Sequence, residues 1–248
     1  MHCGLPFGTG VAKFIRTLAV AALVVLGAAS CGGEKATKKR VAAAAAPALE
    51  HVQLAARVSE RNRISLRNRP GGRVLAQVGS TTEFGSPQTL AVALRKGDWL
   101  AVRSPALAND QLGWVRASRL RVLPRPRWLE VDLSRRQLRV RDGDGAMRRI
   151  DVAIGAPDTP TPPGEFYVTD KLAGAEFGTY YGCCILALSG RQPDLPQGWS
   201  GGDRLAIHGS PTVTWGHAVS NGCLHASEND LRYLMKAVPL GTRVVIHA

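Results

Sequence analysis

Hydrophobic and polar positions alternate in short segments over much of the chain, a period typical of β-strands. In the first half this pattern predicts strands over residues 73–78, 99–103 and 113–117, separated by turns rich in Gly, Asn and Asp. No helical period persists between residues 54 and 122. This stretch is therefore expected to form a small all-β domain.

A second group of strands follows a proline-containing connection at residues 123–127, which favours an extended backbone. Alternation and turn residues predict its strands at 128–133, 137–141, 149–155, 166–169, 205–207 and 243–246. One helix is predicted around residues 231–235, because Leu231, Leu234 and Met235 share a face behind a polar, capping-competent start. The whole chain is thus predicted to be mainly β.

The first thirty residues have a different pattern, a basic start followed by an apolar run. Residues 18–29 have the length of a signal-peptide core and are short for a membrane span. Small residues lead directly to Cys31, which resembles the lipobox of bacterial lipoproteins, although Ala28 stands where leucine is usual. We interpret residues 1–30 as a signal peptide. Cys31 is then either a lipidated membrane anchor or incidental behind an ordinary cleaved signal.

Composition and charge narrow the class of partner. Residues 31–50 contain little that can be buried and are interpreted as a flexible tether. Beyond them the composition is that of a globular protein, with 45% hydrophobic and 21% charged residues. The net charge of +13 favours polyanions such as nucleic acid, anionic lipid or an anionic cell wall. The arginines are scattered and no nucleic-acid motif is present, so no nucleic-acid partner is expected.

The cysteines of the second half are the first sign of chemistry. Cys183, Cys184 and Cys223 are an odd number in a chain interpreted as exported, so at least one is unpaired unless two chains pair. One reason to keep a free thiol in an oxidising compartment is that its thiolate is used. Cys183 and Cys184 are not expected to form a disulfide with each other. We interpret them as packing residues, or one of them as part of a disulfide elsewhere in the domain. It also lacks the spacer of common zinc motifs, so no metal is expected.

A histidine and a cysteine stand close together in residues 204–225. An apolar strand over 205–207 delivers His208, and a Gly- and Pro-containing loop leads to Cys223. An imidazole within hydrogen-bond reach could remove the thiol proton or stabilise an ion pair. By themselves, however, a buried structural cysteine and a satisfied structural histidine explain the same residues.

Four stretches, in this order and spacing, resemble the L,D-transpeptidase catalytic domain of YkuD type. They are LEVDLSRRQLRVRDGDGAMRRIDVAIG, TPTPPGEF, AIHGS and SNGCLHASENDLRYL, and His208 and Cys223 lie 15 residues apart, as is usual in that family. The resemblance implies a β-sandwich domain with one or two short helices over residues 127–248.

The resemblance also implies roles for the site residues. Cys223 would be the nucleophile, His208 the proton acceptor and donor, and the carbonyl of Gly209 the group that orients the imidazole. Backbone N–H groups around Asn221 and Gly222 would form the oxyanion site, where one donor is typically worth about 2.7–4 kcal/mol.

This chain departs from the family pattern at two positions. The histidine usual two residues before the cysteine is Asn221, and the arginine or asparagine usual two residues after it is His225. Ser220 and His225 are expected to shape the substrate-binding side of the site, and His225 would recognise a substrate carboxylate less well than arginine. His217 is interpreted as a loop residue.

The implied reaction is acyl transfer at peptidoglycan stem peptides, in cell-wall biogenesis and remodelling, by an extracytoplasmic enzyme that needs no cofactor. Carbapenems commonly inactivate such enzymes by acylating the same cysteine. Two alternatives stay open. One is hydrolysis of the same stems, as an L,D-carboxypeptidase or a cross-link-cleaving enzyme. The other is a catalytically inactive, wall-binding lipoprotein.

The first half has a resemblance of its own. The stretch KGDWLAVRSPALANDQLGWVRASRLRV resembles bacterial SH3-like domains, which are small β-barrels, and the resemblance extends over residues 54–122. Such modules often bind or position an enzyme on the cell wall. Trp114 could serve such a ligand, or it could equally be a packing residue.

Overall fold

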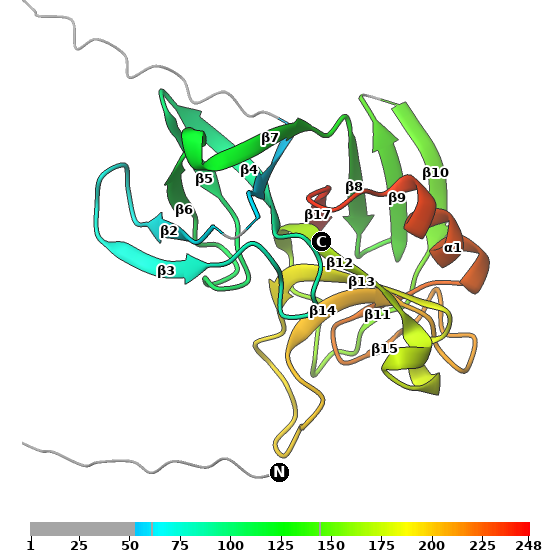
Figure 1. Cartoon of the computed structure of the whole chain (residues 1–248). Helices are drawn as coiled ribbons and strands as arrows, with labels where there is room; N and C mark the ends of the chain where they lie inside the picture. Colours follow the sequence, from blue (N-terminus) through cyan, green and yellow to red (C-terminus); the bar gives the residue numbers. More distant parts are fainter. Residues whose placement is uncertain (1–52, 61, 144) are drawn as a thin grey trace, which may run out of the picture. The chain divides into compact units, whose positions relative to one another are not determined.

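A computed structural model of the protein describes residues 53–248 except 61 and 144. Within these residues the fold is mainly β, as expected from the sequence (Figure 1). It has 17 strands and one α-helix. The predicted signal peptide over 1–30, the predicted lipidation of Cys31 and the predicted tether over 31–50 fall outside the described residues. None of the described helices is both long and apolar enough to cross a membrane.

The first region is a seven-stranded antiparallel sheet in the order β3-β2-β6-β5-β4-β1-β7. Its strands are β1 (Leu54–Val58), β2 (Ile64–Arg67), β3 (Val74–Val78), β4 (Thr89–Lys96), β5 (Trp99–Val102), β6 (Gly113–Arg116) and β7 (Leu120–Pro124). The three strands predicted here are present as β3, β5 and β6. Trp114 on β6 is half-buried and lies outside the buried cluster of this sheet.

The second region is an eight-stranded sheet in the order β10-β9-β8-β17-β12-β13-β14-β16. Its strands are β8 (Arg127–Asp132), β9 (Gln137–Asp142), β10 (Gly145–Asp151), β12 (Gly164–Ala173), β13 (Cys184–Arg191), β14 (Arg204–His208), β16 (Leu224–His225) and β17 (Arg243–His247). Two short strands, β11 (Ile154–Gly155) and β15 (Ala218–Ser220), form a separate parallel pair. Three short 3₁₀ turns complete the described elements: η1 (Ala117–Arg119), η2 (Gly174–Glu176) and η3 (Thr179–Tyr181).

Strand β12 joins the two halves of this larger sheet. Its first residues, 164–167, pair with β17, and residues 168–173 pair with β13. Side chains from both halves, such as Val131, Leu186 and Ile207, are buried in one apolar cluster. The cluster fixes β14 and β16, the two strands that carry His208 and His225, against the rest of the domain.

Helix α1 (Glu228–Ala237) begins directly after the strand that follows Cys223. Ser227 caps it by accepting a hydrogen bond from the Asp230 N–H, and Leu231 and Leu234 are buried on its inner face. The helix therefore anchors the chain that follows Cys223 to the apolar cluster of the domain. The sequence prediction of its apolar face is confirmed.

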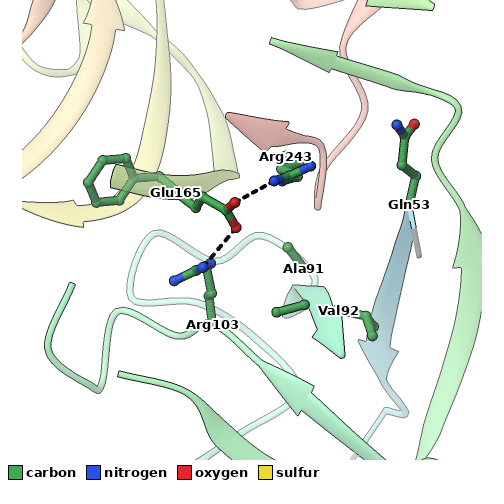
Figure 2. A pocket seen from close by; sticks show the side chains of 8 residues that line it. Gln53, Ala91, Val92, Arg103, Glu165 and Arg243 are labelled. Atoms are coloured by element: carbon green, nitrogen blue, oxygen red, sulfur yellow. Dashed lines mark hydrogen bonds and ion pairs between the residues drawn. The ribbon is translucent and has the colours of Figure 1, made fainter. Parts of the chain in front are cut away.

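The two β regions share buried contacts. Tyr167 of β12 is fully buried and packs into the apolar cluster of the first sheet. Glu165, also of β12, accepts hydrogen bonds from Arg103 of β5–β6 and Arg243 of β17 beside a small cavity of about 120 Å³ (Figure 2). Burial alone would raise the pKa of Glu165, but the hydrogen bonds from Arg243 and Arg103 outweigh burial and hold its pKa below the ordinary value.

Candidate active site

The parallel pairing of β14 with β16 brings the predicted site residues together. Ile207 lies opposite Leu224, and His208 lies opposite His225. Cys223 directly precedes β16, at the end of the turn that leads into this strand. His208, Cys223 and His225 line one open cleft of about 410 Å³.

His208 forms the floor of this cleft and is only 2% exposed. Its Nδ1 lies 2.6 Å from the carbonyl oxygen of Gly209. A carbonyl can only accept, so Nδ1 carries the proton and Nε2 is left as the basic nitrogen. Burial, and secondarily the neighbouring His225, lower the pKa of His208 to about 4, while the Gly209 carbonyl opposes the shift. The imidazole is therefore neutral at neutral pH.

Cys223 is half-buried, and among the described residues it is the free cysteine. Its Sγ lies 3.8 Å from the carbonyl oxygen of Arg204, which accepts the S–H. Burial raises the pKa of Cys223 to about 11, although a backbone hydrogen bond from Ala206 opposes the shift. The resting pair is thus a neutral thiol and a neutral imidazole, which suits removal of the proton during attack better than a preformed ion pair.

Ser220 ties the turn before Cys223. Its hydroxyl donates to the Cys223 carbonyl at 2.6 Å and accepts from the Gly222 N–H at 3.1 Å. The Gly222 N–H, expected from the sequence as an oxyanion donor, is therefore occupied. The N–H groups of Asn221 and Cys223 have no partner within the described part of the chain and are the donors left at this turn. Ser220 is 3% exposed, so it shapes the turn and is too buried to contact substrate directly.

The proline-rich loop after β11 lies beneath this turn. Thr159 Oγ1 donates to the Ser220 carbonyl at 3.0 Å, and Thr161 Oγ1 donates to the Gly222 carbonyl at 2.9 Å. The buried amide of Gln192 donates to the Pro160 carbonyl at 2.8 Å and touches the loop from the other side. In the sequence this loop matches the L,D-transpeptidase motif TPTPPGEF, but the motif gives no role to Thr159, Thr161 or Gln192.

Gly222 also shows why the turn needs glycine. Its φ is +104°, and a Cβ there would lie 2.3 Å from Nε2 of Gln192. Both the backbone conformation and the close approach of Gln192 exclude a side chain, so the turn that presents Cys223 is rigidly specified.

Two tyrosines form an aromatic wall above the imidazoles. The ring of Tyr181 lies 4.9 Å from that of His208, and the ring of Tyr180 lies about 6 Å from both His208 and His225. The Gly209 N–H donates to the Tyr181 carbonyl at 2.9 Å, which fixes the segment carrying the tyrosines to the end of β14. Their side chains come from a 3₁₀ turn with no recognisable motif, and no signal in the sequence identifies them.

His225 is more buried than its predicted role requires. It is 2% exposed, burial lowers its pKa, and its Nδ1 lies 3.1 Å from Thr214 Oγ1. A neutral, buried imidazole is a poor partner for a substrate carboxylate. Asn221, in contrast, is exposed at the rim of the same cleft.

The adjacent cysteines differ from the sequence expectation. Cys183 and Cys184 form a disulfide with each other. Strand β13 begins only at Cys184, directly after a turn at Gly182 with φ of +67°. The turn interrupts the alternation that would place neighbouring side chains on opposite faces, so the two sulfurs meet. No group of three His, Cys, Asp or Glu side chains is arranged as a metal site in the described part.

Residues 126–246 match the YkuD family, described as an L,D-transpeptidase catalytic domain. The matched residues make up just under half of the 248-residue chain and contain His208 and Cys223.

Among curated proteins, it is 32% identical over 124 residues to “Putative L,D-transpeptidase YkuD” of Bacillus licheniformis, and 30% identical over 125 residues to the protein of the same name of Bacillus subtilis. Each match covers 49% of this chain and 66% of the relative, so the chain spans slightly less than two thirds of their length.

The chain is also similar to solved structures, with low sequence identity and low TM-scores. An L,D-transpeptidase from Mycobacterium smegmatis is 16% identical with a TM-score of 0.39, covering 63% of this chain and 70% of that one. L,D-transpeptidase 3 from Mycobacterium tuberculosis, in complex with a faropenem-derived adduct, is 17% identical with a TM-score of 0.39, covering 57% and 69%.

Proposed function

We propose that the protein is a peptidoglycan L,D-transpeptidase in which Cys223 is the nucleophile and His208 the proton acceptor and donor. The observation that carries the proposal is that His208, at the end of β14, and Cys223, directly before the paired strand β16, line one cleft. The orientation of His208 by the Gly209 carbonyl supports it, because Nε2 is the nitrogen left to accept a proton.

The proposed reaction has two halves. Sulfur of Cys223 attacks the carbonyl of the L-centred stem residue while Nε2 of His208 takes the thiol proton. The C–N bond to the terminal D-Ala breaks, the proton passes from His208 to the departing amine, and a thioester forms. The amine of a second stem then attacks the thioester, gives its proton to His208, and the proton returns to the sulfur as the cross-link is released.

The oxyanion of both tetrahedral intermediates needs donors at the Cys223 turn. The N–H groups of Cys223 and Asn221 fit this role, because the Gly222 N–H is already used within the turn. Each such donor is typically worth about 2.7–4 kcal/mol in the transition state. Ser220, Thr159 and Thr161 then act as positioning residues that hold the turn in place.

The remaining parts of the chain fit an enzyme of the cell wall. We propose that the region over 54–122 is the SH3-like positioning module. The proposal also includes export through the signal peptide at 1–30, a lipid anchor on Cys31 and a tether over 31–50, which place the enzyme on the outer face of the membrane. Each lipid CH₂ inserted in a bilayer contributes about 0.8 kcal/mol.

Incubation with a disaccharide-tetrapeptide tests the reaction. A transpeptidase yields cross-linked dimers together with free D-Ala. An L,D-carboxypeptidase, which shares the first half-reaction, yields tripeptides and free D-Ala without dimers. An inactive wall-binding protein leaves the tetrapeptide intact. Dimers that are absent with Cys223→Ala support the proposal, and either of the other two outcomes contradicts it.

A further inference from the structure

Positive charge is distributed unevenly between the two β regions. Residues 125–248, which contain the cleft, hold 14 Lys and Arg against 13 Asp and Glu, and are nearly balanced. Residues 53–124 hold 12 Lys and Arg against only 4 Asp and Glu. Within residues 53–248, the charge excess that favours an anionic partner therefore belongs mainly to the first β region and not to the region of the catalytic cleft.

Part of this charge gathers in one concavity of the first sheet. A cleft of about 310 Å³ is lined by four arginines and by Trp99, and no acidic side chain lines it. The arginines come from three adjoining segments, next to or within β2, on β6 and in η1: Arg63, Arg67, Arg116 and Arg119. We call this the arginine cleft.

The arginines of the cleft differ from those of the catalytic region. There, arginines such as Arg127, Arg148 and Arg191 pair with carboxylates. In the arginine cleft, none of the four has an ion pair with any residue that the structure describes. Four like charges without counter-charges repel one another, and a bound anion removes that repulsion.

Two of the four guanidinium groups are held in place before any ligand arrives. Arg67 donates to the carbonyl of Gly72 at 2.6 Å, and Arg116 stacks 4.9 Å from the ring centroid of Trp99. Arg63 and Arg119 are exposed at the rim. Fixed guanidinium groups lose less conformational freedom on binding, and their planar donors match the oxygens of phosphate or carboxylate.

We propose that the arginine cleft is a binding site for the oxyanions of a linear anionic polymer, with phosphate or carboxylate groups as the recognised chemistry. A concave site fits single units of a chain better than a planar bilayer surface. Nucleic acid fits less well, since the face of Trp99, which a base would stack on, is already covered by Arg116. The site would hold the enzyme on an anionic matrix, independently of what the catalytic cleft does.

The test measures binding of the full chain to polyphosphate, to polygalacturonate and to phosphatidylglycerol vesicles at several salt concentrations. The variant Arg63→Gln/Arg119→Gln removes two charges from the cleft. Its matched control, Arg73→Gln/Arg121→Gln, removes two exposed arginines of the same region that lie outside the cleft. Thermal melting and the alkylation rate of Cys223 verify that both variants are folded.

We expect the cleft variant to lose about tenfold or more in affinity for one or both polymers, and to reduce the salt slope by about two. The control should lose less than threefold. The polymer that responds identifies phosphate or carboxylate as the recognised group. Equal losses in the two variants would show attraction by net charge alone, and binding to the vesicles but to neither polymer would show a membrane surface; either result overturns the proposal.

Discussion

The imidazole rings of His208 and His225 lie 4.6 Å apart, centroid to centroid, on neighbouring parallel strands. Both rings are buried, and both have pKa values below the ordinary value. Burial lowers the pKa of both rings, and the neighbouring His225 adds to the lowering of the pKa of His208. The pair keeps His208 available as a base at neutral pH.

Replacing His225 with Asn should raise the pKa of His208. The shift will be partial, because burial is the larger cause of the lowering and remains. The acid limb of the pH profile of kcat/KM should therefore move to higher pH, which is measurable with a chromogenic β-lactam as acylating substrate. His217→Asn, which removes an exposed imidazole outside the cleft, should leave the limb in place. An acid limb that stays fixed or moves lower in the His225 variant contradicts the coupling.

Acid should weaken the fold in a definite pH window. The pKa of His208 is about 4 in the folded protein against 6.5 ordinarily, so between these values the unfolded chain binds more protons. Stability therefore falls as pH falls from about 6.5 to 4. Urea unfolding at pH 7 and pH 5 measures the loss, which should be smaller in His208→Gln. An unchanged pH dependence in that variant would contradict the assignment.

Ser220→Ala should affect both stability and chemistry. The variant loses two hydrogen bonds that hold the Cys223 turn, and we expect a cost of about 1–3 kcal/mol together with slower acylation of Cys223. Ser227→Ala removes a helix cap, which is worth about 1 kcal/mol, and is the matched control. The two are compared by denaturant melts and by acylation rate. Equal acylation rates in the two variants would remove Ser220 from the positioning residues.

Much of the fold follows from local pattern. Hydrophobic and polar residues alternate along strands that have one buried face. This pattern predicted the bounds of β5, β6, β8 and β9 to within a residue or two. Strand β13, an interior strand of the eight-stranded sheet between β12 and β14, was not predicted. Its residues 184–190 are all buried, because the strand is covered on both faces and so shows no alternation.

The residues of the candidate site likewise fall into those that the sequence predicted and those that it did not. His208 and Cys223 could be proposed because family motifs surround them. The contacts that hold them could not, because Thr159, Thr161 and Gln192 reach the Cys223 turn across about 30 to 60 residues. The disulfide of the adjacent cysteines likewise depends on a local turn that breaks the strand pattern.

The central claim is that the sulfur of Cys223 forms the acyl-enzyme. Intact-mass measurement of the full chain after incubation with a carbapenem tests it most directly. We expect a single adduct equal to the mass of the carbapenem on the wild-type protein, and none on Cys223→Ala, which lacks the free thiol of the cleft. No adduct on the wild type, or an adduct that persists in Cys223→Ala, would contradict the account.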